Sequence, residues 1–496
     1  MNAVIDYAGP APEPMSDIDV RAMAVGLAQV TSPDRVWHGA AAQRRYPGDM
    51  SWLTCVHAQY GRPLVRHEVA VRVASTREVS RVMKYASAMG IPVTPFGGGS
   101  GVQGAANSTC GGILLDLGGL NKVRHIDSTS VTCTVEAGKI IQPFEAELNA
   151  MGLSFPHYPA SAEWASVGGS VAAKGAGVLS TKYGTMQDHV LSAEIVLANG
   201  DIVQMPSVPR HGAGPDLTQM FAGSEGTLGI ITAVTVKLRP LPTQRRFLAI
   251  GFDNLAPGVE AGRRIMTEAA HPAVMRFYDK PAATQSLNKA VAADITGETM
   301  VIMYDGSHAA LIDTETTLAR QICEEQGGRM LDSGIGPQWW DNRYTFCHPP
   351  HAPELPQIWC TMDAVADYSH IMGVYDAVTR AVIDSVDPKW GLTVKTHFSH
   401  WFDWGAMIYP RVIIPKGPDD LGQALELHDA FVRAATMAAL QAGGIMNGHH
   451  GLGMRLAPYL GDQFSPESMA LMRTIKGALD PARLLCRGKL DMDEPG

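Results

Sequence analysis

The stretch that most constrains this chain is Pro95-Phe96-Gly97-Gly98-Gly99-Ser100-Gly101-Val102-Gln103-Gly104, which follows an apolar, strand-like run at residues 91–94. Five glycines within eight residues remove the Cβ atoms from a tight turn. Backbone N–H groups can then converge on one anion, and the chain can adopt positive φ. The loop is therefore either a phosphate cradle or simply a glycine-rich turn.

The glycine spacing also contains a misleading match. Gly99, Gly101 and Gly104 fit G-x-G-x-x-G, the fingerprint of a Rossmann dinucleotide site. That site needs a helix that opens at the glycines and an acidic residue about 20 positions further on, whereas residues 105–112 are typical of turns. We therefore reject a Rossmann site and expect any pyrophosphate to be bound in another way.

Local patterns around the loop predict alternating strands and helices. Alternation at Val69, Val71 and Val73 predicts a strand, and a capping box at residues 75–78 predicts a helix that Gly90 ends. With the run at 91–94, this is a βαβ unit. Further on, Asn199-Gly200 predicts a type I′ hairpin.

Composition excludes several classes of protein. The chain has 496 residues, enough for two or more domains, and a net charge of −9 without a Lys/Arg run, so we expect no nucleic-acid partner. Seven scattered cysteines form no Cys-x-x-Cys pair, which favours a reducing compartment. We find neither a signal-like N-terminus nor an apolar run of about 18 residues, and so predict a cytoplasmic protein without a transmembrane segment.

Three more glycine-containing clusters follow the first, at residues 166–170, 175–177 and 223–231. Repeated close approach of backbone is what a long cofactor needs along its whole length. The set PFGGGSGVQG, SVGGSVAAKGAG, KYG and GSEGTLGIIT resembles the FAD-linked oxidase family, whose FAD domain is of the vanillyl-alcohol-oxidase (PCMH) type. Within that family the chain is most similar to the branch of D-lactate and glycolate dehydrogenases and alkylglycerone-phosphate synthase.

The resemblance implies an α+β fold with a two-subdomain PCMH-type FAD-binding domain. It also implies an α+β cap domain with an antiparallel sheet, and a C-terminal segment that returns to the flavin. We expect a leader and helix at 1–60, the FAD-binding domain at 61–240, the cap at 241–445 and the closing segment at 446–496. Pro240 and Pro242 mark the central boundary.

The same resemblance assigns the FAD contacts. It puts residues 97–102 at the pyrophosphate and Ile231 near the adenine half, with FAD bound non-covalently because the loop contains no His. The implied contact residues are Pro95, Gly97, Gly98, Gly99, Ser100, Gly101, Val102, Pro159, Ser166, Gly168, Gly169, Lys174, Gly177, Gly223, Glu225, Gly226, Gly229 and Ile231.

The C-terminal motif departs from the common family pattern. In Asn447-Gly448-His449-His450-Gly451, His449 replaces the Glu that joins two histidines around a metal in the metal-using members. Tyr409 stands where the second of those histidines would be, after His397 and His400. We therefore predict no metal site, although a divalent ion remains an alternative.

The synthase branch offers a second comparison. The segment Gly405-Ala406-Met407-Ile408-Tyr409 is similar to the one that supplies its catalytic Tyr, and Arg276 matches its phosphate-facing Arg. Gly448 replaces the first His of its triplet, and residues 347–351 offer no match for its second Arg. Arg343 and Arg411 are further candidates to hold a substrate anion.

These residues favour an FAD-dependent oxidoreductase acting on CH–OH groups, either a dehydrogenase or an oxidase. It would remove a hydride to flavin N5 from a 2-hydroxy acid or a bulky or aromatic alcohol, with a histidine as base. One alternative is a synthase-like enzyme that forms an ether through a flavin adduct; another is an FAD-bearing electron-transfer subunit. The acceptor stays open between dioxygen, a quinone and an electron-transfer protein, and a homo-oligomer is compatible with the sequence. The candidate catalytic residues are His449, His450, Tyr409, His400, His397 and Arg276.

Overall fold

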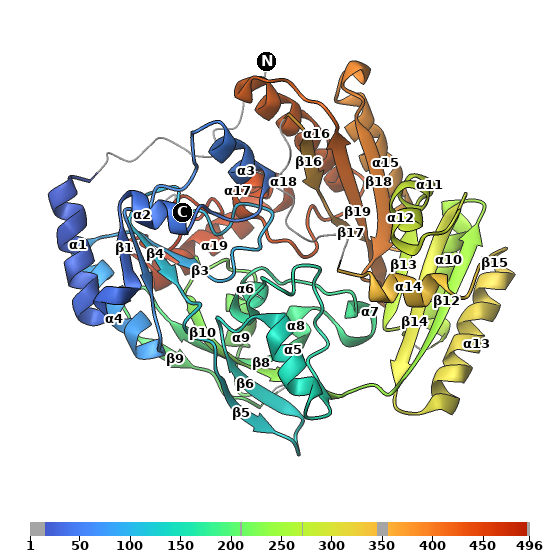
Figure 1. Ribbon diagram of the computed structural model, residues 1–496, viewed down its shortest axis with the longest axis horizontal. Helices are drawn as coiled ribbons and strands as arrows, with labels where there is room; N and C mark the ends of the chain where they lie inside the picture. The colour runs from blue at the N-terminus through green and yellow to red at the C-terminus, as the bar shows by residue number, and fades with distance from the viewer. Residues whose placement is uncertain (1–14, 209–210, 270, 345–355, 494–496) are drawn as a thin grey trace.

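Four strands near the N-terminus form a small mixed sheet in the order β1-β2-β4-β3 (Figure 1). The computed structural model describes residues 15–208, 211–269, 271–344 and 356–493. Strands β2 (Val69–Arg72) and β3 (Val93–Phe96) both run parallel to β4 (Ile113–Asp116), and helix α4 (Thr76–Met89) joins them. Gly90 ends α4 in the left-handed region with φ +66°. The predicted βαβ unit is confirmed, with β4 inserted between its strands.

The region between residues 31 and 60, for which no element is predicted, completes this sheet. It contains β1 (Val36–His38), which pairs antiparallel with β2, and the short helices α2 (Ala40–Arg45) and α3 (Trp52–Gln59). Helix α1 (Asp17–Val30) precedes them, and the Ser16 side chain caps it by accepting from the Asp19 N–H.

A second sheet is antiparallel throughout, in the order β5-β6-β10-β8-β9. Its hairpin at Asn199-Gly200 differs from the prediction. A type I′ turn needs positive φ at both residues, but only Gly200 has it, at +84°, and Leu197 O accepts from the Gly200 N–H. The bounds are β5 (Val123–Asp127), β6 (Thr132–Glu136), β8 (Val190–Val196), β9 (Ile202–Gln204) and β10 (Ile230–Lys237).

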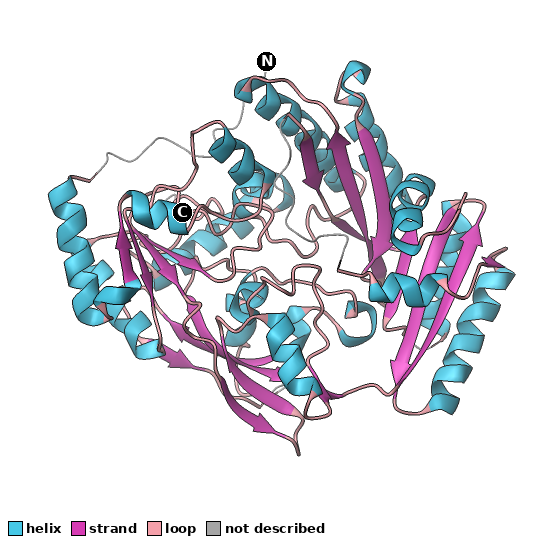
Figure 2. Cartoon of the chain, viewed as in Figure 1, coloured by secondary structure: helices cyan, strands magenta, loops and turns pink. Residues whose placement is uncertain are grey.

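The second half of the chain builds a large antiparallel sheet in the order β15-β12-β14-β13-β18-β19-β16, and β17 also pairs with β19 (Figure 2). One face buries Phe277, Phe398 and Ile408 in a core shared with the covering helices. The strands are β12 (Gln244–Phe252), β13 (Val274–Tyr278), β14 (Glu298–Gly306), β15 (Arg329–Met330), β16 (Ile358–Thr361), β17 (Ala364–Asp367), β18 (Thr393–Ser399) and β19 (Gly405–Ile414). The helices include α10 (Leu255–Glu268), α13 (Ala309–Glu325), α15 (Ile371–Asp384) and α16 (Leu421–Gln441).

The C-terminal segment crosses back to the first sheet, where Figure 1 shows its red ribbon beside the blue strands. Leu485 forms a parallel bridge to Val93, just before the glycine loop. The buried ammonium group of Lys476 donates to Asp480 Oδ2 at 2.6 Å and to the carbonyl of Thr227 at 2.9 Å. The helices of this segment are α17 (Gly453–Leu456), α18 (Leu460–Gln463) and α19 (Pro466–Leu479).

Short elements complete the description. In the part of the chain that the structure describes, no helix is both long and apolar enough to cross a membrane. The remaining elements are η1 (Pro33–Arg35), α5 (Ile141–Asn149), β7 (Leu153–Ser154), α6 (Val167–Ala172), α7 (Ser180–Tyr183), α8 (Met186–His189), α9 (Leu217–Phe221), β11 (Arg239–Pro240), α11 (Lys280–Ala282), η2 (Ala283–Leu287), α12 (Asn288–Val291), α14 (Ile335–Asp341), η3 (Pro388–Trp390) and η4 (Ala457–Tyr459).

Candidate active site

The glycine clusters predicted to bind the cofactor pack directly against one another. A Cβ on Gly97 would lie 2.4 Å from Ser166 Oγ, and one on Gly98 only 1.7 Å from the carbonyl oxygen of Trp164. A Cβ on Gly226 would lie 2.5 Å from the ring of Pro95. The absence of side chains therefore lets three loops, at residues 95–104, 164–169 and 223–229, approach to backbone contact.

The glycine loop leaves a continuous series of donors unused. Within the described residues, no acceptor takes a hydrogen bond from the backbone N–H groups of residues 97–103, all of which lie in a loop. The Gln103 carboxamide is buried, and no residue in the described part of the chain forms a hydrogen bond with its nitrogen or its oxygen. Consecutive unused backbone donors in one loop fit an anionic group, and a cofactor pyrophosphate meets that requirement.

The other predicted cofactor contacts lie in closely packed segments outside the glycine loop. A Cβ on Gly223 would lie 2.9 Å from the side chain of Lys174, and one on Gly177 would lie 2.5 Å from the backbone of Tyr158. Ile231 is buried in β10. Gly168, Gly169 and Ser166 lie at the start of α6, where the Ser166 hydroxyl caps the helix. Pro159 opens a turn by accepting from the Ala162 N–H.

Glu225 forms hydrogen bonds that the sequence does not predict. Its buried carboxylate accepts from the N–H groups of Leu452 and Gly453, 3.0 Å from the latter, and so holds the C-terminal segment. Burial raises the pKa of Glu225 to about 7, although these two donors lower it. The carboxylate therefore joins the cofactor loops to the histidine motif.

The histidine turn, residues 447–453, is held from three sides. Glu225 binds its C-terminal end, and the Gln103 carbonyl of the glycine loop accepts from Met454 N–H at 2.8 Å, just beyond the turn. From the cap, Asp363 accepts from the N–H groups of Gly448 and His449. Gly448 packs closely, because a Cβ would lie 2.4 Å from the methyl group of Met407 and 2.8 Å from Val365 Cγ2, so a side chain there would require these neighbours to move.

Asp363, which the sequence interpretation missed, contacts both histidine rings. Its Oδ1 lies 2.6 Å from His450 Nδ1, and its Oδ2 lies 3.1 Å from His449 Nδ1. Because an ionised carboxylate only accepts hydrogen bonds, the two Nδ1 atoms act as donors to Asp363. Both Nε2 atoms are then acceptors, and no described residue hydrogen-bonds either of them.

The register of the large sheet explains how Asp363 reaches this place. Strands β16 and β17 pair with β19 in one continuous register on either side of Asp363, which therefore lies opposite Tyr409. Tyr409 pairs with His397, and His397 pairs with Tyr278. Directly opposed residues project to the same face, so these four side chains form one line across the sheet, the Tyr409 row.

The candidate catalytic rings gather at this row. The ring centroids of His397 and Tyr409 are 4.8 Å apart, those of Tyr409 and His450 5.3 Å, and those of His449 and His450 3.8 Å. His400 follows the end of β18 with φ +51°, which bends the chain and brings its ring to 4.9 Å from His449. A regular strand would point His397 and His400 to opposite faces; the bend brings both to one site.

Burial keeps three of these histidines uncharged near neutral pH. It lowers the pKa of His450 to about 4, with a further contribution from His449, while Asp363 opposes the shift. Burial also holds the pKa of His397 and of His400 well below the usual value. Burial alone would raise the pKa of Asp363, but the two adjacent imidazoles hold it well below its usual range. The site therefore combines an ionised carboxylate with neutral imidazoles.

The three candidate arginines have different surroundings. Arg276 lies two residues from Tyr278 along β13, which places it on the same face as Tyr409. Arg411, on β19, lies on that face on the other side of Tyr409. Arg343 instead stacks on the ring of Trp340 at 3.9 Å and donates to its carbonyl. Residues 347–351, examined for a second arginine, lie outside the described residues.

The metal prediction rests partly on a missing carboxylate, and Asp363 supplies one. One ligand atom from each of Asp363, His449 and His450 lies within 4.8 Å of the others. Hydrogen bonds between these same atoms already satisfy them in the structure. The geometry therefore has the donor set for a divalent ion but does not require one.

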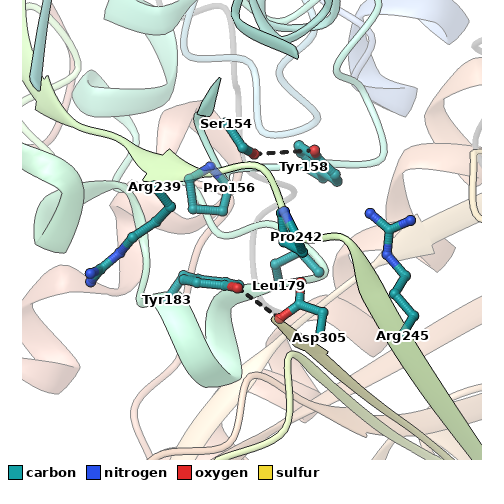
Figure 3. Close-up of a pocket in the computed structure, with 9 residues that line it drawn as sticks. All are labelled: Ser154, Pro156, Tyr158, Leu179, Tyr183, Arg239, Pro242, Arg245 and Asp305. Carbon is teal, nitrogen blue, oxygen red and sulfur yellow. Dashed lines mark hydrogen bonds between the residues drawn. The ribbon is translucent and has the colours of Figure 1, made fainter. Parts of the chain in front are cut away.

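A polar crevice at the junction of the two halves is separate from this site (Figure 3). Tyr183 donates to Asp305 Oδ1 at 2.7 Å, and Lys182 also binds this carboxylate. None of the predicted site residues lines the crevice. The lining residues are Ser154, Pro156, Tyr158, Leu179, Tyr183, Arg239, Pro242, Arg245 and Asp305.

Comparison with known proteins assigns the chain to a family. Residues 67–206 match the FAD binding domain model, and residues 241–490 match the model for the C-terminal domain of FAD linked oxidases. The chain therefore belongs to the family of FAD-linked oxidases, and FAD is its cofactor. The family resemblance, the α+β fold class and the cofactor predicted from the sequence are confirmed.

Individual relatives align with most of the length of the chain. The glycolate oxidase subunit GlcD of Bacillus subtilis (strain 168) is 26% identical over 430 residues, which cover 85% of this chain and 88% of that protein. A structure of alkyldihydroxyacetonephosphate synthase aligns with a TM-score of 0.76 at 20% identity over 98% of this chain and 86% of that one. Substrate-bound p-cresol methylhydroxylase aligns with a TM-score of 0.75 at 17% identity, over 97% and 98%.

Proposed function

We propose that this protein oxidises a hydroxylated carbon of a small-molecule substrate, a 2-hydroxy acid or another secondary alcohol. The observation that carries the proposal is the pair of histidines held by Asp363 through Nδ1, with both Nε2 atoms left as acceptors beside Tyr409. When bound, FAD supplies a hydride acceptor for the carbon that carries the hydroxyl. The cradle at residues 97–103 and the loops around it would hold the cofactor.

His450 is the base in this proposal. Its lowered pKa keeps Nε2 unprotonated at neutral pH, so it can accept the hydroxyl proton of the substrate. The Asp363 carboxylate at 2.6 Å from Nδ1 would then stabilise the imidazolium that forms. His449, with a longer contact to the same carboxylate, would fix the orientation of the turn.

The remaining residues would orient the substrate. The Tyr409 hydroxyl belongs to the same row as Asp363 and can bind the substrate oxygen. Arg276 would bind a carboxylate bidentately, which suits a 2-hydroxy acid. The name of the glycolate oxidase relative supports this substrate class. We propose that FAD contacts the residues that the family resemblance implies, and that Glu225 holds the histidine turn. We also propose a cytoplasmic location.

A second function has its own support. The segment Gly405–Tyr409, Arg276 and the paired histidines resemble alkylglycerone-phosphate synthase, and the fold of a synthase of this type aligns over 98% of the chain. Such an enzyme would exchange an acyl for an alkyl group without net oxidation. Gly448 stands where that enzyme has the first histidine of its triplet, so this chain lacks that side chain, which favours oxidation here.

Anaerobic mixing of the yellow holoprotein with a panel of 2-hydroxy acids and aromatic alcohols tests the proposal. We expect at least one substrate to bleach the flavin absorbance, and we expect His450→Ala to bind FAD normally but to bleach about 10²–10⁴-fold more slowly. Ether formation from an acyl substrate without bleaching would favour the synthase function. Reduction only by a protein donor would instead favour an electron-transfer subunit.

A further inference from the structure

A second group of polar side chains lies on the same sheet face as the Tyr409 row. Two pairs further along the strands, Lys395 on β18 pairs with Arg411 on β19, and Arg411 pairs with Thr361 on β16. Directly opposed residues share a face, so the three side chains form a parallel line, the Lys395 row. Two residues along a strand separate the two rows by about 7 Å.

In the Lys395 row, the cationic side chains of Lys395 and Arg411 lie directly opposite each other on neighbouring strands. Like charges at directly opposed positions of a sheet destabilise it, and among the described residues no carboxylate forms an ion pair with Lys395 or Arg411. Partial burial, together with Arg411 and Lys289, lowers the pKa of Lys395. Both side chains are half-buried, so solvent screens their repulsion only in part.

Thr361 adds an independent observation. The residue is only 7% exposed, and none of the described residues forms a hydrogen bond with its hydroxyl. A buried hydroxyl without a partner is uncommon and carries a free-energy cost. An oxyanion bound between Lys395, Arg411 and Thr361 would relieve the repulsion and satisfy the hydroxyl together.

We propose that Lys395, Arg411 and Thr361 form a subsite for a second anionic group of the substrate. Arg276 lies on the opposite side of the Tyr409 row, so the substrate would extend across the row with an acidic group at each end. The inference rests on the proposed function, because it places the hydroxylated carbon at Tyr409. The substrate is then a 2-hydroxy acid with a distal carboxylate or phosphate, rather than a short monocarboxylate.

Binding of three inert probes to the oxidised holoprotein tests this subsite by calorimetry. Valerate carries one anionic group, glutarate carries a second carboxylate, and phosphonobutyrate carries a phosphonate instead. We expect at least one dianion to bind about tenfold or more tightly than valerate. Each hydrogen bond from the subsite to the second anionic group would add to the binding free energy. Tighter glutarate binding would identify a distal carboxylate, and tighter phosphonobutyrate binding a distal phosphate.

Two substitutions, Lys395→Gln and Arg411→Gln, should each reduce dianion affinity about tenfold or more beyond any loss for valerate. Lys395→Arg should retain the preference, which separates loss of charge from misfolding. Lys416→Gln removes one charge from an exposed position two residues beyond β19 and is the matched control. Equal binding of the three probes by the parent protein, or equal losses in Arg411→Gln and Lys416→Gln, would overturn the proposal.

The two proposals fail separately in this design. The probes carry no hydroxyl group, so their binding does not depend on oxidation. A protein that prefers dianions but is bleached by no alcohol retains the subsite and loses the proposed function. One that oxidises 2-hydroxy acids without any preference for dianions retains the function and loses the subsite.

Discussion

The glycine cradle at residues 97–103 and the Tyr409 row are both proposed to bind a ligand, yet they use different parts of the chain. The cradle presents backbone N–H groups from one short loop, and its neighbours approach because side chains are absent. The row presents side chains from β13, β18, β19 and the link between β16 and β17, which the sheet register aligns. Local sequence thus determines the first site, and long-range pairing determines the second.

The difference predicts how each site responds to substitution. In the cradle, added volume is the damaging change, because backbones already touch. In the row, loss of a single hydrogen-bonding atom is the damaging change, because burial leaves the partner group without water.

The largest effect is expected from Gly98→Ala. The new Cβ would lie 1.7 Å from the Trp164 carbonyl oxygen, so the glycine loop and the loop at 164–169 would have to separate. We expect loss of FAD from the purified protein and a decrease in unfolding free energy of about 3 kcal/mol or more. Flavin absorbance per protein and urea unfolding measure these two effects.

Gly477→Ala is the matched control, since Gly477 lies within α19 and a Cβ there would meet no atom within 4 Å. It should keep FAD and gain about 0.5–1 kcal/mol of stability. If Gly98→Ala retained full FAD and parental stability, the close packing of the cradle would not matter.

Asp363→Asn should leave FAD binding by the glycine cradle intact and impair catalysis at the Tyr409 row. The amide would place an N–H donor against a histidine Nδ1 and favour the tautomer with the proton on Nε2. We expect anaerobic flavin reduction by substrate to slow about 10²–10⁴-fold with FAD content unchanged. Asp367→Asn is the control, because the exposed Asp367 binds His370 Nδ1 at 2.7 Å in a similar pair four residues away. Equal rates in both variants would refute the role of Asp363.

Glu225→Gln addresses the junction between the two sites. Burial raises the pKa of Glu225 to about 7 in the folded state, so its carboxyl stabilises the fold at low pH. That contribution is lost as the pH rises from about 4.5 through about 7, by about 3 kcal/mol in total. The variant should match the parent in urea unfolding at pH 5 and exceed it in stability at pH 8. An identical difference at both pH values would contradict the raised pKa.

The sequence predicts the glycine cradle better than the Tyr409 row, because the cradle depends on local sequence and the row on long-range strand pairing. The βαβ unit, the cap of α4 and the glycine clusters depend on neighbours within a few residues, and patterns reveal them. Asp363 lies 86 and 87 residues from its two histidines, in a short link between β16 and β17 that has no motif. The sequence shows only a lone carboxylate between two apolar runs. Its position opposite Tyr409 follows only from the pairing of β16 and β17 with β19.

The hairpin at Gly200 and the bend at His400 were similarly beyond local patterns. A turn type depends on φ at both central residues, and Asn-Gly is compatible with more than one type. His400 adopts φ +51° where β18 ends, and its ring nitrogen Nδ1 lies against the Ser180 hydroxyl, a contact across 220 residues. Tertiary contacts, rather than propensity, select these conformations.

The central claim is that Asp363 holds His450 in the Nδ1–H tautomer and leaves Nε2 free to take the substrate proton. Nitrogen-15 NMR of the imidazole groups in the oxidised holoprotein at pH 7, with His450 assigned by comparison with His450→Gln, measures this directly. We expect a protonated Nδ1 and an unprotonated Nε2 for His450. A proton on Nε2, or a fully protonated ring at this pH, would contradict it.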